Sequence, residues 1–207
     1  MPSLPEHPIR RLAVVATVAL LSLGGMAACG GNGSHGASSR GDEVDPNAPD
    51  ESPPGDIPDN QVFVPYQFPD GSFTLKVPEG WSRTEQGGTI TFTDNFNSIM
   101  LSTEPATVAP TVDSATSNEL AAIAAAAPGY EAGRVEAVTR SGGPAIRISY
   151  RSDSPPDAVT GRTAPLDVER YEFFDGGREI VLVLSGPRGA DNVDPWRLVS
   201  DSVRYGS

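Results

Sequence analysis

The chain is poor in the residues that carry most enzyme chemistry. Its 207 residues include one cysteine and two histidines, and both histidines, His7 and His35, lie within the first 40 positions. A single cysteine excludes a disulfide framework within the chain and any metal site built from several thiolates. After residue 60 there is neither residue type, which argues against Ser-His-Asp or Cys-His catalysis and against histidine-ligated metals there. We therefore expect no cofactor and no metal.

Positive charge is also scarce. Lysine and arginine number 15 against 27 aspartates and glutamates, which gives a net charge of -12. So acidic a chain repels the phosphates of nucleic acids, and nucleic-acid binding is not expected. The length suits one domain of medium size, alone or with a tail.

The N-terminal residues have the pattern of an export signal. Two arginines precede an apolar run of twelve residues, 12–23, and a bilayer span needs about 20. Small residues then lead to the lone cysteine, and the segment 26–29 (Met-Ala-Ala-Cys) resembles a bacterial lipobox with Met in place of the usual Leu. We expect residues 1–28 to be a lipoprotein signal peptide. The alternatives are an ordinary cleaved signal and a retained anchor helix.

Lipidation at Cys29 fixes the expected location of the protein. One acyl chain holds a protein to a membrane only weakly, whereas the two chains of a diacylglycerol hold it stably. A diacylglycerol on Cys29 would anchor the protein to the extracytoplasmic face of the cell membrane. We predict no modification at any other residue.

Residues 29–60 have the composition of a disordered acidic Gly/Ser/Pro tether. From residue 30 to residue 60 there is no aromatic side chain, and seven acidic residues accompany one basic residue, Arg40. Such a segment buries too little apolar surface to offset the entropy lost on ordering. Its charge should keep it extended, so that it holds the next domain clear of the membrane. The same composition is equally compatible with a simple spacer whose length has no functional importance.

Residues 61–207 have the composition of a folded domain. Both tryptophans, all seven phenylalanines and all five tyrosines lie there. Alternation of apolar and polar residues predicts strands, and spacings of three and four predict a helix between Pro110 and Pro128 and another over 194–203. The unbroken apolar run 180–184 predicts a central strand covered on both faces. The expected strands are 62–68, 72–77, 89–93, 98–102, 134–140, 145–151, 168–174 and 179–185.

These elements predict an α+β fold, an antiparallel sheet of about seven strands covered by helices. With the segment 77–81 (Val-Pro-Glu-Gly-Trp), their order resembles the PsbP-like α/β/α sandwich. That fold occurs in an extrinsic photosystem subunit and in small actinobacterial lipoproteins of the LpqN type. The resemblance covers most of residues 62–205. It implies an accessory, partner-binding role, and it implies no catalytic residues.

Acidic side chains are the remaining candidates for catalysis. Paired carboxylates can hydrolyse glycosidic bonds when a cleft holds them together. Nothing in the sequence brings such a pair together, so we expect surface acids and no catalytic residue. The segment 94–97 (Asp-Asn-Phe-Asn) lacks the glycine and the distal glutamate of a calcium loop, so we expect a plain turn. The acids considered as candidates are Asp153, Asp157, Asp167, Glu169 and Glu172.

Basic and aromatic residues offer binding surfaces. We expect the arginines to form cross-strand ion pairs with neighbouring glutamates, and the alternative is an outward stripe that recognises an acidic partner. Trp81 and Trp196 are expected in the core, with a binding anchor as the alternative. The loop 152–163 is long enough to carry recognition. The arginines are Arg140, Arg147, Arg151, Arg170 and Arg178, and the glutamates are Glu136, Glu169, Glu172 and Glu179.

The anchor, the tether and the scarcity of catalytic residues together predict a non-enzymatic protein. We expect a binding or accessory module for an envelope protein partner, on a surface that the sequence does not identify. The alternative is a carrier of a small apolar ligand or lipid in a cavity between sheet and helix. Small side chains over 121–127, six of them alanines, would leave room for such a cavity.

Overall fold

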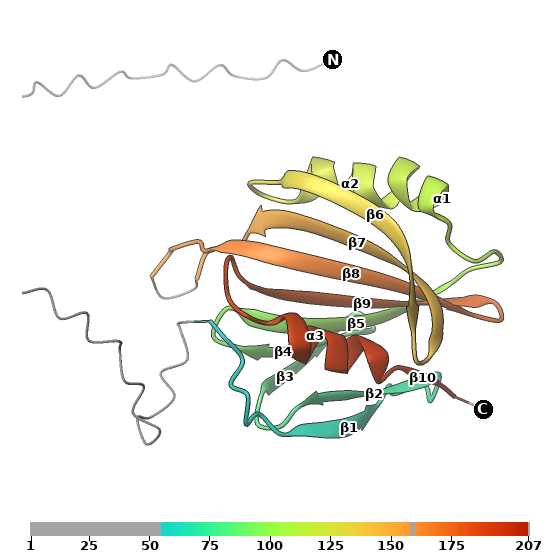
Figure 1. Cartoon of the computed structure of the whole chain (residues 1–207), viewed down its shortest axis with the longest axis horizontal. Helices are drawn as coiled ribbons and strands as arrows, with labels where there is room; N and C mark the ends of the chain where they lie inside the picture. The colour runs from blue at the N-terminus through green and yellow to red at the C-terminus, as the bar shows by residue number, and fades with distance from the viewer. Residues whose placement is uncertain (1–54, 158–159, 207) are drawn as a thin grey trace, which may run out of the picture. The chain divides into compact units, whose positions relative to one another are not determined.

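Alternating apolar residues build a large antiparallel sheet in the computed structural model, which describes residues 55–157 and 160–206. Within these residues, seven strands pair in the order β3-β4-β5-β9-β8-β7-β6 (Figure 1). The expected class, an α+β fold with an antiparallel sheet of about seven strands, is confirmed. The strands are β3 (Ser82–Gln86), β4 (Thr89–Asp94), β5 (Asn97–Pro105), β6 (Glu131–Arg140), β7 (Gly143–Asp153), β8 (Pro165–Asp175) and β9 (Arg178–Pro187).

A second, smaller sheet contains β1 (Phe63–Gln67), β2 (Phe73–Pro78) and β10 (Arg204–Tyr205). The expected hairpin of the first two strands forms, but it belongs to this small sheet and not to the large one. The edge strand of the large sheet, next to β4, is β3 instead. All five residues of β3 are exposed, so its sequence carries no alternation that could have predicted a strand.

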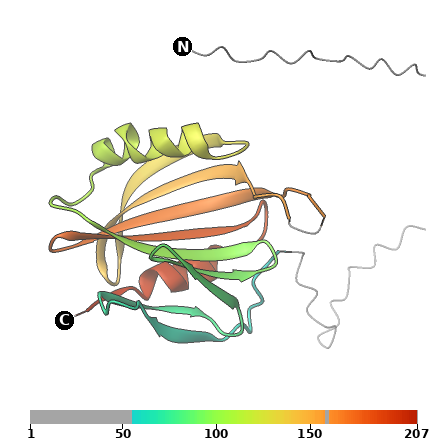
Figure 2. The same ribbon diagram turned by 180° about the vertical axis from the view of Figure 1, so that it is seen from behind.

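Three helices complete the layers. They are α1 (Val112–Ser117), α2 (Glu119–Ala126) and α3 (Val193–Asp201). α1 and α2 lie on one face of the large sheet, and α3 and the small sheet lie on the other (Figures 1 and 2). The single helix expected after Pro110 is broken at Asn118. Thr111 caps α1, since its hydroxyl accepts a hydrogen bond from the Ser114 N–H.

The main hydrophobic core lies between the large sheet and the layer formed by the small sheet and α3. Its side chains include Phe73, Phe173 and Leu182, all nearly fully buried. A smaller cluster under α1 and α2 contains Ala115, Ile146 and Ile148. β9 is the fourth strand of seven, so the expectation of a central strand covered on both faces is confirmed.

The chain contacts this domain from Gly55 onwards. Ile57 is buried, and its backbone N–H donates to the Asn192 Oδ1 at 2.8 Å. The last residues assigned to the tether 29–60 therefore pack on the domain. The expected signal peptide 1–28, Cys29 and the rest of the tether lie outside the described residues. Within the described part of the chain, no helix has the length and apolar character to cross a membrane.

Candidate functional site

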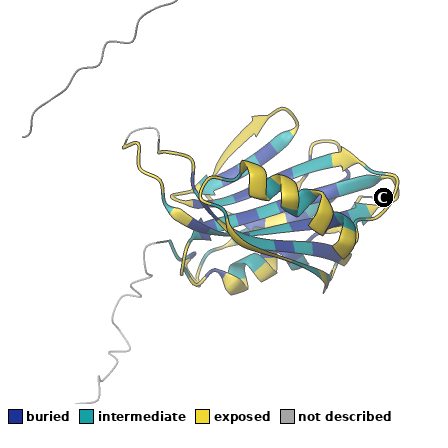
Figure 3. Ribbon diagram, turned by 90° about the horizontal axis from the view of Figure 1, so that it is seen from above, coloured by how far each residue is buried: buried dark blue, intermediate teal, exposed yellow. Residues whose placement is uncertain are grey.

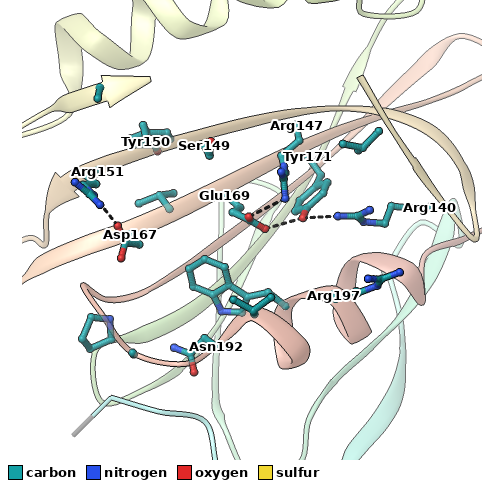
Figure 4. Close-up of a pocket in the computed structure, with 17 residues that line it drawn as sticks. Arg140, Arg147, Ser149, Tyr150, Arg151, Asp167, Glu169, Tyr171, Asn192 and Arg197 are labelled. Carbon is teal, nitrogen blue, oxygen red and sulfur yellow. Dashed lines mark hydrogen bonds and ion pairs between the residues drawn. The ribbon is translucent and has the colours of Figure 1, made fainter. Parts of the chain in front are cut away.

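A groove of about 710 Å³ opens between the large sheet and α3 (Figure 4). Strands β6, β7 and β8 form its floor, while the β9–α3 loop and α3 form one wall. Pockets that bind small ligands measure about 300–1,000 Å³, so the groove is large enough to receive a side chain cluster or a small molecule.

The floor is polar because the strands alternate. Arg147, Ser149 and Arg151 point to the α3 side of the sheet, and the Ile146 and Ile148 side chains point to the α1–α2 side. The register places Tyr171 of β8 opposite Arg147. The small sheet and α3 cover the apolar part of this face, which leaves its polar part to line the groove.

Arg147 lies at the centre of the floor, between two carboxylates. Its Nε donates to the Glu136 Oε1 at 2.9 Å, and its Nη2 contacts the same oxygen. Its Nη1 donates to the Glu169 Oε1 at 3.1 Å. Burial opposes the charge of Arg147, but these two carboxylates outweigh it and raise the pKa of the guanidinium. The hydrogen bond from Arg147 in turn lowers the pKa of Glu136.

A second arginine extends this network through a tyrosine. The Arg140 Nη2 donates to the Tyr171 Oη at 2.9 Å, and that hydroxyl donates to the Glu169 Oε2 at 2.6 Å. Burial and the neighbouring Glu169 raise the pKa of the Tyr171 phenol, so the phenol keeps its proton and remains a donor. The connected side chains form a rigid polar floor.

The ends of the groove carry exposed arginines. Arg151 and Arg197 have 51% and 72% of their side chains exposed, and each has one carboxylate partner, at 3.0 Å for Asp167 and 3.5 Å for Asp201. The groove lining contains four arginines and two acidic residues. Two further carboxylates, Glu136 and Asp201, also pair with these arginines, so the two exposed guanidinium groups, Arg151 and Arg197, are the ones that can bind an anionic ligand by exchange.

The wall along α3 is mostly apolar. Trp196 packs partly against the main core and also lines the groove, and Val193 is 71% exposed beside it. Both tryptophans contact the core as expected, and Trp196 also has the position of the binding anchor named as the alternative. The residue spacing did not identify Val193 or Arg197. Both are surface residues of α3, and the spacing that predicted this helix involves only the apolar residues of its buried face.

Asn192 fixes the start of this wall. It is buried, and its Nδ2 donates to the Gly55 carbonyl at 3.2 Å and to the Asn97 Oδ1 at 3.0 Å. Asn97 in turn donates to the Gly55 carbonyl at 3.0 Å. The segment 94–97 is therefore the β4–β5 turn, and its last residue holds together the chain entry and α3.

Two of the acidic candidates line the groove, Asp167 and Glu169, and they pair with Arg151 and Arg147. Asp153 ends β7, and Asp157 accepts hydrogen bonds from the backbone and hydroxyl of Thr160 inside the loop. Neither aspartate lines the groove. Among the residues that the structure describes, no group of three or more His, Cys, Asp or Glu side chains is placed to hold a metal ion.

The five arginines do not form one stripe. Arg140, Arg147 and Arg151 line the groove, whereas Arg170 lies opposite Ile148 and points to the other face of the sheet. Arg178 pairs with Asp70 of the β1–β2 turn at 3.6 Å. Strand alternation separates them, and the stripe hypothesis did not take it into account. The expected cross-strand ion pairs with glutamates do form, as for Arg147 and Arg170.

The alanines of α2 do not line a cavity. Five of the six small side chains point to solvent, and the helix has no buried residue (Figure 3). The carrier alternative would need a cavity between this helix and the sheet, whereas the groove lies at α3, on the opposite face. The exposed alanines are Ala121, Ala122, Ala124, Ala125 and Ala126.

Comparison with solved structures finds similar folds at low sequence identity. The solution structure of cyanobacterial PsbP (CyanoP) from Synechocystis sp. PCC 6803 is 15% identical with a TM-score of 0.50, over 73% of this chain and 98% of that chain. LpqN of Mycobacterium tuberculosis, which is involved in cell envelope biogenesis, is 16% identical with a TM-score of 0.41, over 72% and 92%. For a Bacteroides thetaiotaomicron crystal structure the values are 14% and 0.47, over 69% of this chain and only 48% of that protein.

No family model matches the sequence, and no curated protein sequence does either. At these identities the comparisons establish the fold alone. The similarity to CyanoP confirms the PsbP-like α+β fold that the sequence resembles. Kinship with LpqN-type lipoproteins remains a prediction.

Proposed function

We propose that this protein is a lipid-anchored, non-enzymatic binding module on the extracytoplasmic face of the membrane. Its recognition surface is the groove beside α3, which receives an acidic segment of an envelope protein partner. The observation that carries the proposal is the presence of two exposed arginines, Arg151 and Arg197, beside the apolar wall of this groove. The lipobox-like segment ending at Cys29 supports the anchor, and the PsbP-like fold is compatible with an accessory role.

The two exposed arginines are suited to exchange partners. Exposed ion pairs contribute only about 0–1 kcal/mol, so a carboxylate of the partner can replace Asp167 at Arg151, or Asp201 at Arg197, at little cost. A guanidinium binds a carboxylate through two parallel hydrogen bonds, which fix the orientation of the bound carboxylate. The fixed network at Arg147 keeps the floor in place while the exchange occurs.

The apolar wall supplies the rest of the binding energy. Interface energy is concentrated in a few residues, with tryptophan and arginine prominent among them. Trp196 and Val193 offer an apolar contact next to the arginines. A segment that alternates apolar and acidic side chains therefore fits the groove.

Titration with a short peptide of alternating Glu and Leu tests this surface, followed by the NMR signals of the two indole N–H groups. We expect the Trp196 signal to shift and saturate while the Trp81 signal stays in place. The double change Arg151→Glu, Arg197→Glu should weaken binding at least tenfold, and the matched change Arg83→Glu on β3 should not. Binding that is unaffected by the double change would contradict the proposed surface.

Crosslinking in native membranes tests the function. The wild-type chain should give a defined adduct with an envelope protein, and the adduct should fade in the Arg151→Glu, Arg197→Glu variant and persist in Arg83→Glu. An adduct of equal strength in all three chains would place the partner elsewhere on the domain.

A second candidate function is supported by the size of the groove. Its volume of about 710 Å³ and apolar wall also suit a small amphiphile with an anionic group. Native mass spectrometry of the full chain, released from membranes in detergent, distinguishes the two functions. A bound small molecule that is lost in the Arg151→Glu, Arg197→Glu variant would favour the carrier, and a ligand-free protein would favour the binding module.

A further inference from the structure

Four glutamates, three on the large sheet and one on α2, gather on the side of the sheet opposite the groove. Glu104 on β5 lies directly across from Glu179 on β9, and Glu172 on β8 is diagonal to Glu179. Glu119 is the first residue of α2, and its charge acts on both Glu172 and Glu179. We call these four side chains the acidic seam.

The charge of the acidic seam is only partly compensated. Arg170 on β8 donates from its Nε to the Glu172 Oε1 at 2.6 Å, and its Nη2 lies 3.8 Å from the Glu179 Oε1. The Tyr150 phenol on β7 is also close to Arg170 and stays protonated, since burial raises its pKa. One guanidinium therefore faces four carboxylates, and the fully ionised seam carries a net negative charge.

Two carboxylate oxygens of the seam are buried without a partner. Glu172 is 0% exposed, and neither its Oε2 nor the Oε2 of Glu119 has a hydrogen bond. A buried charge without compensation is costly, so a proton is favoured on Glu172. Burial raises the pKa of Glu172, and burial together with the charge of Glu172 raises the pKa of Glu179 to about 7.

The helices over the seam are held by few contacts. Ala115 is the one buried residue of α1, and α2 has none. Leu120 and Ile123 are only partly buried against the cluster of Ile146 and Ile148. Segments with so little buried apolar area open at low free energy, before the rest of a domain unfolds.

We propose that α1 and α2 form a proton-dependent cover over this face of the sheet. The cover stays docked while Glu172 and Glu179 hold protons, and it loosens as these two carboxylates ionise, which exposes Ile146 and Ile148. This inference does not depend on the groove or its partner.

Hydrogen exchange of the full chain in detergent tests the cover, with rates corrected for the intrinsic effect of pH. Between pH 5.5 and pH 8 we expect the open population of α1 and α2 to rise at least tenfold relative to that of β8 and β9. Glu179→Gln should remove most of this rise. The matched change Glu85→Gln, at an exposed glutamate on β3, should leave it intact.

Three results would overturn the proposal. They are an open population of α1 and α2 that does not change with pH, a pH response that survives in Glu179→Gln, and an equal loss of protection in all strands. Glu119→Gln provides a second variant, because its side chain lies on α2 and its change spares the sheet. Glu119→Gln should also reduce the rise in the open population of α1 and α2 between pH 5.5 and pH 8. A rise of unchanged size would contradict the proposed role of the acidic seam.

Discussion

At the scale of single residues, Asn192 has the most consequential side chain outside the apolar core. It is buried and joins three parts of the chain, through the Ile57 N–H, the Gly55 carbonyl and the Asn97 Oδ1. Asn192→Ala removes these bonds and leaves buried polar groups unpaired. We expect a loss of about 2–4 kcal/mol in the free energy of unfolding, measured by chemical denaturation.

Asn118→Ala is the control for that change. Asn118 is exposed, and its side chain makes no capping hydrogen bond. Its replacement should alter the free energy of unfolding by less than about 0.5 kcal/mol. Equal effects of the two changes would show that the Asn192 contacts do not hold the chain entry.

Gly186 is required by close packing. A Cβ at this position would lie 2.5 Å from the Asn97 Oδ1 and 2.7 Å from the Asn192 Nδ2, with Trp196 at 3.3 Å. Gly186→Ala would therefore separate the two asparagines and shift the tryptophan on the groove wall. We expect a loss of about 1–3 kcal/mol in thermal or chemical unfolding, with a changed Trp196 indole signal. Gly87→Ala in the β3–β4 turn also lowers stability, because its φ is +58°, but its Cβ meets no atom and both indole signals should stay in place.

At the scale of elements, the first turn of α1 depends on a reciprocal cap. Thr111 accepts from the Ser114 N–H at 3.1 Å, and the Ser114 hydroxyl accepts from the Thr111 N–H at 2.9 Å. Thr111→Ala should cost about 1 kcal/mol, expressed as faster hydrogen exchange in α1. Thr111→Ser keeps the hydroxyl and should restore protection. Equal exchange in both variants would mean that the cap does not stabilise the helix.

Elements with one buried face could be predicted from the sequence. The alternation of β7 and the apolar run of β9 each gave the correct strand, because burial selects the residue type at every second position or along the whole run. β3 escaped prediction, since its five residues are exposed and backbone pairing with β4 is what makes it a strand. The break between α1 and α2 was also missed, because both helices lie on the same face of the sheet.

The groove could be predicted only in part. Alternation correctly placed Arg147 and Arg151 on the side away from Ile146 and Ile148. Which of the two faces meets α3 depends on pairing between segments far apart in sequence, and local periodicity does not contain that information. The same limit explains why Arg170 was grouped with the groove arginines although it pairs with Glu172 and Glu179 of the acidic seam.

At the scale of the whole domain, the two faces of the large sheet have opposite chemistry. The α3 face carries a broad apolar core and an arginine-rich groove, and the α1–α2 face carries a small cluster and the acidic seam. Strand alternation makes this separation possible, because successive residues of β8 serve different faces. Glu169 thus completes the groove network while Arg170 compensates the seam.

The seam should also govern how the stability of the whole domain varies with pH. Folding raises the pKa of Glu172 and Glu179, so the native state binds more protons than the unfolded state above pH 4.5. Stability from these groups is present at low pH and is lost as pH rises from about 4.5 through about 7. Glu136 and Asp70 have lowered pKa values, so their contribution is lost as pH falls below about 4.

These opposed effects predict a maximum of stability at mildly acidic pH, near 5. We expect the free energy of unfolding in urea to fall by up to about 3 kcal/mol between pH 5 and pH 7.5, since a change of one pKa unit is worth about 1.4 kcal/mol. Glu179→Gln should flatten this slope and raise stability at pH 7.5, because a neutral amide has no proton to lose. A maximum at or above pH 7.5 in the wild-type chain, or an unchanged slope in the variant, would show that the seam glutamates are already ionised in the folded state.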